Sequence, residues 1–480
     1  MRFSQAPPRG PAGSRVSVAF MSDETVFVII GASGDLASRL LLPALGELLV
    51  AQPERRVHLV GTGRSESSDA QWRKTVRRAF GTADAESALT GSIVSTPYIR
   101  ADASTASGLR TILHALPEVD DGRVVLYFAV PPQVAASACR ALKPKDLPPG
   151  TILALEKPFG DDEASARELN EVLGALVPER QVFRVDHFLG RSTVLNLLGV
   201  RFANRFVEPA WSAEHIAAIT VRFDESLGLE GRAGYYDRAG ALVDMIQSHL
   251  LQVLAILTMA PPATLGDADV RDATAAALRA TRVWEDNAVR FSHRARYTAG
   301  AIDGRDLPDY AAEPGVDPSR QTETLAQATF EVRTDRWAGV PITLRSGKAI
   351  GGAVTEIVVR FRPVRHLPAG FTGAEEPAVL RFSLGPDRLS LSINVNGGTD
   401  PFALQRTTLE ADLGVGAQRA YVDVLAALLD GDPTLSVRGD AAEECWRILQ
   451  PIRDAWARGD VPLEEYPAGS AGPADWDPDR

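Results

Sequence analysis

The pattern of apolar positions changes near residue 200 of this 480-residue chain. From Thr25 to about residue 190, short runs rich in Val and Ile alternate with stretches whose apolar residues recur at helical spacing. This alternation is typical of βαβ units, because parallel strands covered by helices on both faces read as continuous apolar runs. Helices are expected between the strands, most clearly over 36–50 and 162–177. The expected strands are 25–30, 57–61, 124–130, 151–155 and 181–185.

Beyond residue 200 the strands alternate between apolar and polar positions. Residues 389–396 read LSLSINVN, with strict period two, which indicates a half-buried antiparallel strand. Residues 378–384 are expected to pair with it across the turn at 385–388. Further strands are expected at 219–225 and 354–364. Helices are expected over 233–258, 271–283, 416–430 and 440–458, the last with Trp446, Leu449, Ile452 and Trp456 on one face.

A glycine-containing loop follows the first strand. GASGD, residues 31–35, leaves the strand and opens a helix, so Gly31 and Gly34 would permit a tight turn and close approach of a pyrophosphate to the helix N-terminus. The full GxGxxG pattern is absent because Ala32 and Ala37 replace two possible glycines. Dinucleotide binding and a purely structural turn both remain open on this loop alone.

The end of the second strand bears on the choice of cofactor. An NAD site usually has an Asp or Glu there for the ribose hydroxyls, whereas this chain has Arg64 and Ser65, which could hold a 2′-phosphate. We therefore expect NADP rather than NAD, although Glu66 is close in sequence.

Two other strand ends carry polar residues. In EKPFG, Lys157 precedes Pro158, where the peptide bond can be cis. Asp186 and His187 are neighbours at a strand end and should point to opposite sides. In parallel sheets, ligands bind at the carboxyl ends of the strands, so one cleft could collect these groups.

A later apolar segment carries Asp244 and His249. On an ideal α-helix a separation of five residues turns two side chains roughly 140° apart, so the spacing alone does not place them in one site. An imidazole backed by a carboxylate, such as His249 with Asp186, could accept the hydroxyl proton in an alcohol oxidation by hydride transfer. A buried structural histidine is the alternative.

Composition and charge exclude several classes of protein. The chain has 51 Lys and Arg against 62 Asp and Glu, a net charge of −11, which disfavours nucleic-acid or anionic-membrane partners. An anionic substrate would need a local basic cluster, for which His187, Arg191, Lys157 and Lys348 are available. Only Cys139 and Cys445 are present, at no metal-ligand spacing, so we expect no metal site and a reducing, cytoplasmic setting.

The N-terminal residues and the longest apolar stretches bear on targeting and membrane insertion. Residues 1–22 lack apolar periodicity and a signal-like apolar run, so we expect a disordered tail, and translation could begin at Met1 or Met21. We find no stretch of about 20 apolar residues that would span a bilayer.

Taken in order, these segments resemble the glucose-6-phosphate dehydrogenase family over residues 25–475. The resemblance rests on nine motifs in the family's order. They are GASGDLASRLLLPAL (31–45), YFAVPP (127–132), EKPFG (156–160), RVDHFLGR (184–191), ESLGLEGRAGYYD (225–237), DMIQSHLLQ (244–252), SRQTETLA (319–326), RWAGVPITLRSGKAI (336–350) and YPAGSAGP (466–473).

The resemblance implies a fold, an activity and a set of site residues. The fold would be an N-terminal Rossmann-like domain over 23–198 and a substrate-binding α+β domain over 199–480. The second domain would hold a large, mainly antiparallel sheet that is backed by helices and used in a homodimer or a dimer of dimers. The activity would be the oxidation of glucose 6-phosphate with NADP. His249 would be the general base and Asp186 its partner. Substrate would contact Lys157, His187, Arg191, Glu225, Asp244 and Lys348, and NADP would contact Gly31, Ser33, Gly34, Asp35, Leu36, Arg64, Ser65, Pro131, Lys157 and Pro158.

Departures from the family pattern keep two alternatives open. The family usually has Tyr and Lys where Phe188 and Arg191 stand, a basic residue where Ala353 stands, and another near Leu40. Each departure loses or alters a donor to an anion. The alternatives are a dehydrogenase for another sugar or sugar phosphate, and a weakly catalytic NADP-binding regulatory paralogue.

Overall fold

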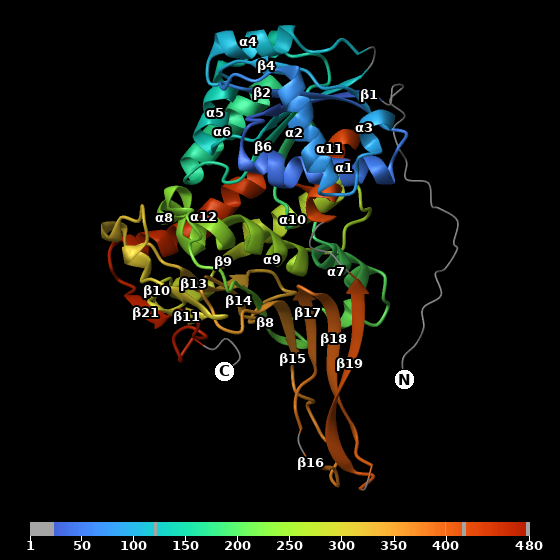
Figure 1. Ribbon diagram of the computed structural model, residues 1–480. Helices are drawn as coiled ribbons and strands as arrows, with labels where there is room; N and C mark the ends of the chain where they lie inside the picture. The colour runs from blue at the N-terminus through green and yellow to red at the C-terminus, as the bar shows by residue number, and fades with distance from the viewer. Residues whose placement is uncertain (1–23, 120–121, 374, 399, 415–418, 477–480) are drawn as a thin grey trace.

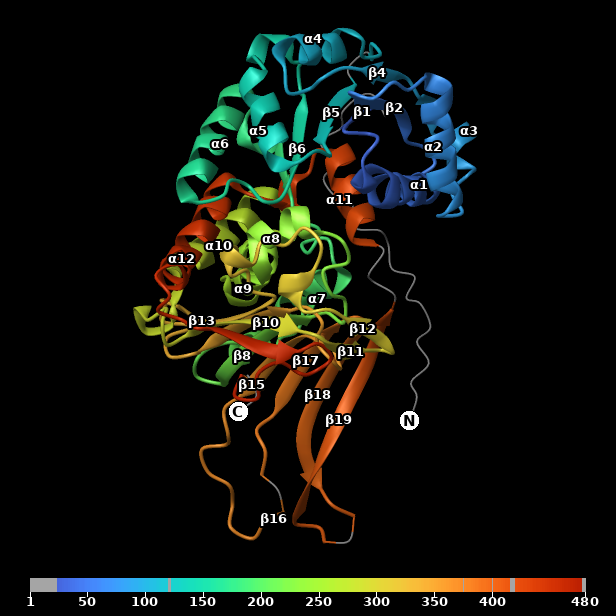
Figure 2. The same cartoon turned by 60° about the vertical axis from the view of Figure 1, so that its left-hand side comes forward.

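The computed structural model describes residues 24–119, 122–373, 375–398, 400–414 and 419–476. In it the chain folds into two sheets, with a layer of helices between them (Figures 1 and 2). The expected tail at 1–22 lies outside the described residues and stays a prediction.

The first sheet has the strand order β20-β7-β6-β5-β1-β2-β3, with β4 also pairing with β2. β1 lies in parallel between β2 and β5, and β6 lies in parallel between β5 and β7. Its strands are β1 (Glu24–Ile30), β2 (Arg56–Gly63), β3 (Ile93–Ser95), β4 (Tyr98–Arg100), β5 (Arg123–Phe128), β6 (Ile152–Glu156) and β7 (Val182–Val185). Its helices are η1 (Ala37–Leu41), α1 (Leu42–Ala51), α2 (Asp69–Gly81), α3 (Ala88–Gly91), α4 (Ala106–His114), α5 (Pro132–Ala141) and α6 (Glu163–Leu176).

The apolar run of β1 serves both faces of this sheet. Val26 and Val28 enter one hydrophobic cluster, whereas Phe27 and Ile29 enter another on the opposite face. This two-sided burial explains why the strand is apolar without alternation. All five strands expected for this sheet are confirmed; β3 and β4 were not predicted, because three residues give no readable period.

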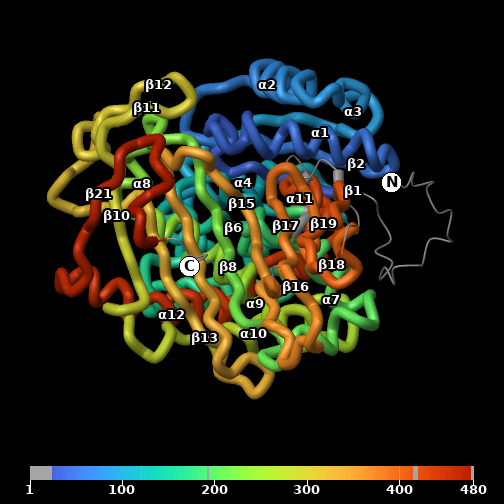
Figure 3. The backbone as a smooth tube through the Cα atoms, turned by 90° about the horizontal axis from the view of Figure 1, so that it is seen from below, coloured from blue at the N-terminus to red at the C-terminus, as the bar shows by residue number. Residues whose placement is uncertain are grey.

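The second sheet has the order β16-β19-β18-β17-β15-β8-β14-β13-β10-β21, with β9 pairing with β13. Its pairs are mostly antiparallel, but β8 with β14, β10 with β21 and β16 with β19 are parallel. In the view from below its strands lie side by side across the molecule (Figure 3). The strands are β8 (Ile216–Asp224), β9 (Thr281–Val283), β10 (Ser292–Thr298), β13 (Leu325–Val332), β14 (Ile342–Gly347), β15 (Thr355–Phe361), β16 (Thr372–Gly373), β17 (Val379–Leu384), β18 (Asp387–Asn396), β19 (Ala403–Gly414) and β21 (Leu463–Pro467). A separate hairpin pairs β11 (Gly300–Ile302) with β12 (Arg305–Leu307).

Between the sheets lies the helical layer. Its members are α7 (Ser192–Phe202), α8 (Ala233–Ala241), the π-helix η5 (Leu242–Leu250), α9 (Leu251–Thr258), α10 (Asp267–Ala280) and α12 (Gly439–Ala457). The four expected apolar residues of α12 are all buried, which confirms their shared face. The continuous helical stretch Ala233–Thr258 is long and apolar enough to cross a membrane by length and composition, but 89% of its most apolar window is buried inside the protein. Such burial is typical of a core helix.

The chain returns to the first domain near its end. Helix α11 (Arg419–Asp430) packs on α1, and Val424, Leu425 and Leu428 join the same cluster as Phe27. Strand β20 (Ser436–Val437) then pairs with β7. The division at 198/199 stays a prediction, and these elements show that residues after it also build the first sheet and its cover.

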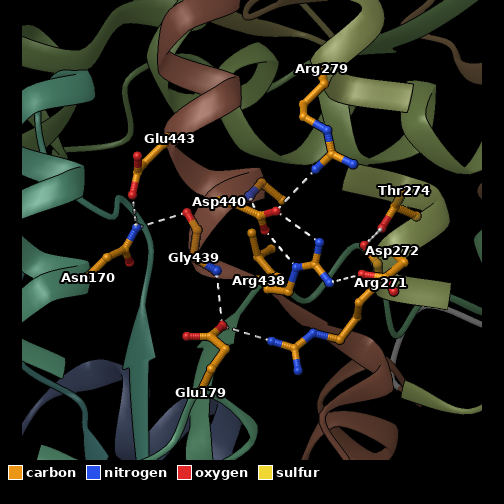
Figure 4. A network of polar contacts seen from close by, with 12 residues as sticks. Asn170, Glu179, Arg271, Asp272, Thr274, Arg279, Arg438, Gly439, Asp440 and Glu443 are labelled. Atoms are coloured by element: carbon orange, nitrogen blue, oxygen red, sulfur yellow. Dashed lines mark hydrogen bonds and ion pairs between the residues drawn. The ribbon is translucent and has the colours of Figure 1, made fainter. Parts of the chain in front are cut away.

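A polar network fastens the first domain to α10 and α12 (Figure 4). The carboxylate of Glu179 accepts hydrogen bonds from Arg184, Arg271 and the backbone N–H of Gly439. Arg184 is fully buried on β7, the strand that leads to Asp186. The network therefore ties the base of that strand to the helical layer.

Candidate active site

The GASGD loop has the geometry of a phosphate-binding turn. Gly31 has a φ of +93°, and a Cβ there would lie 2.4 Å from the carbonyl oxygen of Ala129. Its N–H donates to the carbonyl of Thr62, so the ends of β1, β2 and β5 meet at this loop. Only glycine leaves room for this close packing against the end of β5, which holds the loop in the tight turn before the helix N-terminus.

Most other cofactor candidates lie around the same edge. Ser33, Asp35, Arg64, Ser65 and Pro131 are exposed, Gly34 and Leu36 are half-buried, and Pro158 is buried behind a cis Lys157–Pro158 bond.

Arg64 is available to an anion. Its guanidinium makes no hydrogen bond to any residue that the structure describes, and its charge acts on the carboxylate of Asp102. Glu66, the nearby carboxylate, pairs with Arg100 at the end of β4. The residues present therefore fit NADP, with Arg64 facing solvent at the end of β2 as a 2′-phosphate partner.

Asp186 and His249 form a buried pair. Oδ1 of Asp186 lies 2.5 Å from Nδ1 of His249, and both side chains are at most 1% exposed. Oδ2 accepts a 2.6 Å hydrogen bond from Ser248, and Oδ1 also accepts from the N–H of Phe188. Both carboxylate oxygens are thus hydrogen-bonded, and the carboxylate fixes the ring orientation of His249.

His187 belongs to the same cluster, contrary to the expected opposite orientation. Its ring centroid lies 4.7 Å from that of His249. The period-two rule fails here because β7 ends at Val185 and the chain turns through Asp186–Gly190. Asp186, His187 and His249 offer ligand atoms all within 4.8 Å of one another, a grouping that could also hold a metal ion.

A π-helix brings Asp244 into this site. Residues Leu242–Leu250 form a π-helix. In a π-helix the backbone hydrogen bonds join residues five apart, so such residues lie one turn from each other on the same side. Asp244 and His249 therefore lie on one side, and their charges interact. The ideal α-helix used in the sequence reading could not give this result.

Two ion pairs complete the sugar-facing side. Nζ of Lys157 lies 2.9 Å from Oδ1 of Asp244, and Nζ of Lys348 lies 2.6 Å from Oε2 of Glu225. Lys348 also lies over the ring of Tyr236, and its charge acts on Asp244. All eight residues predicted to act in catalysis or substrate binding therefore belong to one cluster, linked by direct contacts or by charge–charge interactions.

Arg191 packs against aromatic rings. Its guanidinium carbon lies 4.6 Å from the centroid of Phe188 and 5.3 Å from that of Phe223, and it donates to the carbonyl of Leu384. Its charge reaches His187. Ala353 is exposed beyond Gly352, so no cation stands at that position.

The titration of the pair favours a neutral base beside an ionised carboxylate. Burial lowers the pKa of His249 below its ordinary value, although Asp186 acts in the opposite direction. Burial would raise the pKa of Asp186, but the charge and hydrogen bond of His249 hold it well below its usual range. Burial and the charge of His249 lower the pKa of His187 to about 3.

Sequence reasoning missed several members of the site. Phe188 was read only as a lost donor, yet its ring stacks on His249 with centroids 4.2 Å apart. Ser248 and Tyr421 were not predicted. For Ser248 the sequence did offer a signal, because a hydroxyl residue directly before His249 could reach the same carboxylate. No signal in the sequence links Tyr421 to residues more than 200 positions earlier.

Comparisons with known proteins agree over nearly the whole chain. The sequence pattern described as "Glucose-6-phosphate dehydrogenase, NAD binding domain" matches residues 28–196, and "Glucose-6-phosphate dehydrogenase, C-terminal domain" matches residues 198–478. The chain belongs to the glucose-6-phosphate dehydrogenase family. The family resemblance read from the nine motifs is thereby confirmed.

Individual relatives cover this chain and themselves almost completely. A glucose-6-phosphate 1-dehydrogenase of Gluconobacter oxydans is 38% identical over 462 residues, covering 93% of this chain and 94% of the relative. That of Mycolicibacterium smegmatis is 35% identical over 478 residues, covering 94% and 95%. A solved glucose-6-phosphate dehydrogenase in complex with its substrate superposes with a TM-score of 0.82 at 30% identity, covering 94% of this chain and 95% of that one. The expected pair of domains, Rossmann-like and α+β, is confirmed.

Proposed function

We propose that this protein oxidises D-glucose 6-phosphate at C1 to 6-phospho-D-glucono-1,5-lactone with NADP⁺, the first step of the oxidative pentose phosphate pathway. Family membership, full-length relatives named for this activity and the solved relative with bound glucose 6-phosphate support it. The observation that carries the proposal is the buried Asp186–His249 pair beside two lysine–carboxylate pairs.

His249 is the general base in this proposal. Because its Nδ1 faces Asp186, the hydrogen-bonded tautomer leaves Nε2 as the acceptor for the C1 hydroxyl proton. Asp186 then stabilises the imidazolium that forms. Phe188, stacked on the face of the imidazole, helps to hold the ring in place.

The remaining residues hold the sugar phosphate. Lys157, Asp244, Glu225 and Lys348 present paired donors and acceptors suited to neighbouring sugar hydroxyls. His187 and Arg191 bind the phosphate, and the planar guanidinium of Arg191 can donate hydrogen bonds to two phosphate oxygens.

The glycine loop and Arg64 would hold the cofactor. When bound, NADP⁺ accepts the hydride that leaves C1. Gly31, Ser33 and Gly34 would face its pyrophosphate and Arg64 its 2′-phosphate.

A dehydrogenase for another sugar or sugar phosphate is the second candidate. It is favoured by Phe188, whose side chain has no hydrogen-bond donor, and by the exposed Ala353, which supplies no charge. Both residues reduce the number of donors and cations that could bind a phosphate.

A steady-state comparison separates these candidates. Glucose 6-phosphate, free glucose and other hexose 6-phosphates should each be tested with NADP⁺ and with NAD⁺. We expect the highest kcat/KM for glucose 6-phosphate with NADP⁺. A higher value for free glucose, or for another hexose 6-phosphate, would favour the second candidate.

For the assembly we propose a homodimer or a dimer of dimers. Strands β18 and β19 carry apolar side chains that are exposed in the single chain, among them Leu409, and Phe402 precedes β19. Analytical ultracentrifugation tests this, and a monomer at micromolar concentration would contradict it. We further propose a cytoplasmic location, which the two buried, unpaired cysteines support.

A further inference from the structure

His187 is oriented by ring packing. Its side chain makes no hydrogen bond to any residue within the described part of the chain. Three aromatic neighbours surround it instead: His249 and Phe188 lie edge-on, with centroids 4.7 and 5.1 Å away, and Tyr421 stacks on it. Both ring nitrogens are thus left to a ligand.

The stack with Tyr421 is nearly parallel. The two rings are inclined by 10°, with centroids 5.7 Å apart, which is an offset arrangement within the favourable range for aromatic pairs. Tyr421 therefore blocks rotation of His187 toward that side, while the edge-on rings limit it on the others.

Tyr421 is anchored at its other end. Its hydroxyl donates a long hydrogen bond of 3.4 Å to Oε1 of Glu156, the same oxygen that accepts from the hydroxyl of Tyr127. Burial raises the pKa of Tyr421, so its hydroxyl keeps the proton that it donates. Glu156 ends β6 immediately before Lys157, and Asp186 is the other charged group that faces it.

The helix that carries Tyr421 is anchored in the core of the first domain. Val424, Leu425 and Leu428 of α11 are buried in the core of the first domain, beside α1. The return of the chain to that domain thus places a ring against His187 from a segment far away in sequence.

We propose that Tyr421, held by Glu156, is a positioning residue that fixes the His187 ring for the substrate's phosphate. The inference rests on the proposed function, which assigns His187 to that phosphate. It predicts an effect on substrate affinity that passes through His187.

Three variants separate the ring from its hydroxyl. Tyr421→Leu removes the stack and should raise the KM for glucose 6-phosphate about three- to tenfold, the size expected of one aromatic pair. Tyr421→Phe keeps the stack and loses only a long hydrogen bond, so a rise of at most about twofold is expected. Tyr127→Phe is the matched control: it removes the other hydroxyl on Glu156 without contact to His187, and should leave this KM unchanged. In all three, kcat and the KM for NADP⁺ should stay within about twofold.

A double-mutant cycle with His187→Ala tests the route of the effect. If Tyr421 acts through His187, Tyr421→Leu should have no further effect on the KM once His187 is absent. Should Tyr421→Leu fail to fold, Tyr421→Met takes its place in the cycle.

Two results would overturn the inference while leaving the proposed function intact: an unchanged KM in Tyr421→Leu, or an equal rise with and without His187. A wild-type protein that does not oxidise glucose 6-phosphate at all would overturn the proposed function and this inference together.

Discussion

At the scale of single residues, the pH dependence of activity follows from the state of His249. The base must be neutral, and burial lowers its pKa below the ordinary 6.5. The value of kcat/KM should therefore stay level between about pH 7 and 9 and fall on the acid side, with a midpoint below 6.5. His187 adds no slope in this range, because its pKa is lowered to about 3.

The profile should therefore be the same with and without His187. A pH series of kcat/KM for wild type and His187→Ala checks it. The two should share one midpoint, and a midpoint above pH 7 would contradict the assignment of His249 as a desolvated base.

Arg64 should decide between the two nicotinamide cofactors. Arg64→Ala removes a charge-assisted partner of the 2′-phosphate, so the KM for NADP⁺ should rise roughly ten- to a hundredfold while that for NAD⁺ changes little. Lys74→Ala, an exposed cation on α2, is the control and should affect neither. An equal loss with both cofactors would show that Arg64 holds something else.

At the scale of elements, the start of the π-helix depends on one glycine. Gly240 has φ +63° and ψ 179°, and a Cβ there would lie 2.2 Å from Oε1 of Glu323. The same oxygen accepts from the N–H of Leu242, the first residue of the π-helix. Glu323 thus caps the element that carries Asp244 and His249.

Gly240→Ala should destabilise the protein by about 1–3 kcal/mol, since this backbone region admits essentially glycine alone. It should also lower kcat by displacing the cap. Gly234→Ala, in the same α8 but with open space at its Cβ, should be neutral or slightly stabilising. Denaturant unfolding of both variants measures the difference, and equal stabilities would contradict this role of Gly240.

The elements also show how far the sequence could be read. Long apolar runs such as β1 and the strict alternation of β18 were predictable, because burial on two faces or one leaves a direct trace in composition. The closeness of Lys157, Asp186 and His187 was also predictable, but for a different reason. Each follows a parallel strand, and neighbouring parallel strands end at the same edge of a sheet. The π-helix was not predictable, because nothing in the spacing of Asp244 and His249 marks a change from four-residue to five-residue hydrogen bonds. The role of Tyr421 could not be predicted either, because its position beside His187 depends on the return of α11 to the first domain.

At the scale of the whole molecule, the network around Glu179 should contribute to joining the domains. Glu179→Ala would leave the buried Arg184 and Arg271 without their carboxylate. Because Glu179 is itself 41% exposed, we expect the substitution to lower the free energy of unfolding by about 1–3 kcal/mol. This is less than the cost of breaking a fully buried pair. Glu168→Ala, which breaks the exposed pair with Arg140, should cost at most about 1 kcal/mol.

Chemical denaturation followed by tryptophan fluorescence measures both losses. Trp446 on α12 and Trp72 on α2 report on the two regions that the network joins. A loss in Glu179→Ala no larger than in Glu168→Ala would mean that solvent replaces the carboxylate without penalty.

The most direct test of the account follows the hydrogen at C1. Glucose 6-phosphate labelled with deuterium at C1 should be incubated with NADP⁺ and either the wild type or His249→Ala, with His215→Ala as a control at an exposed histidine. We predict that deuterium appears in the reduced nicotinamide with wild type and His215→Ala, and that His249→Ala lowers the rate roughly 10²- to 10⁴-fold. Transfer at the wild-type rate by His249→Ala, or no transfer from this substrate by the wild type, would contradict the account.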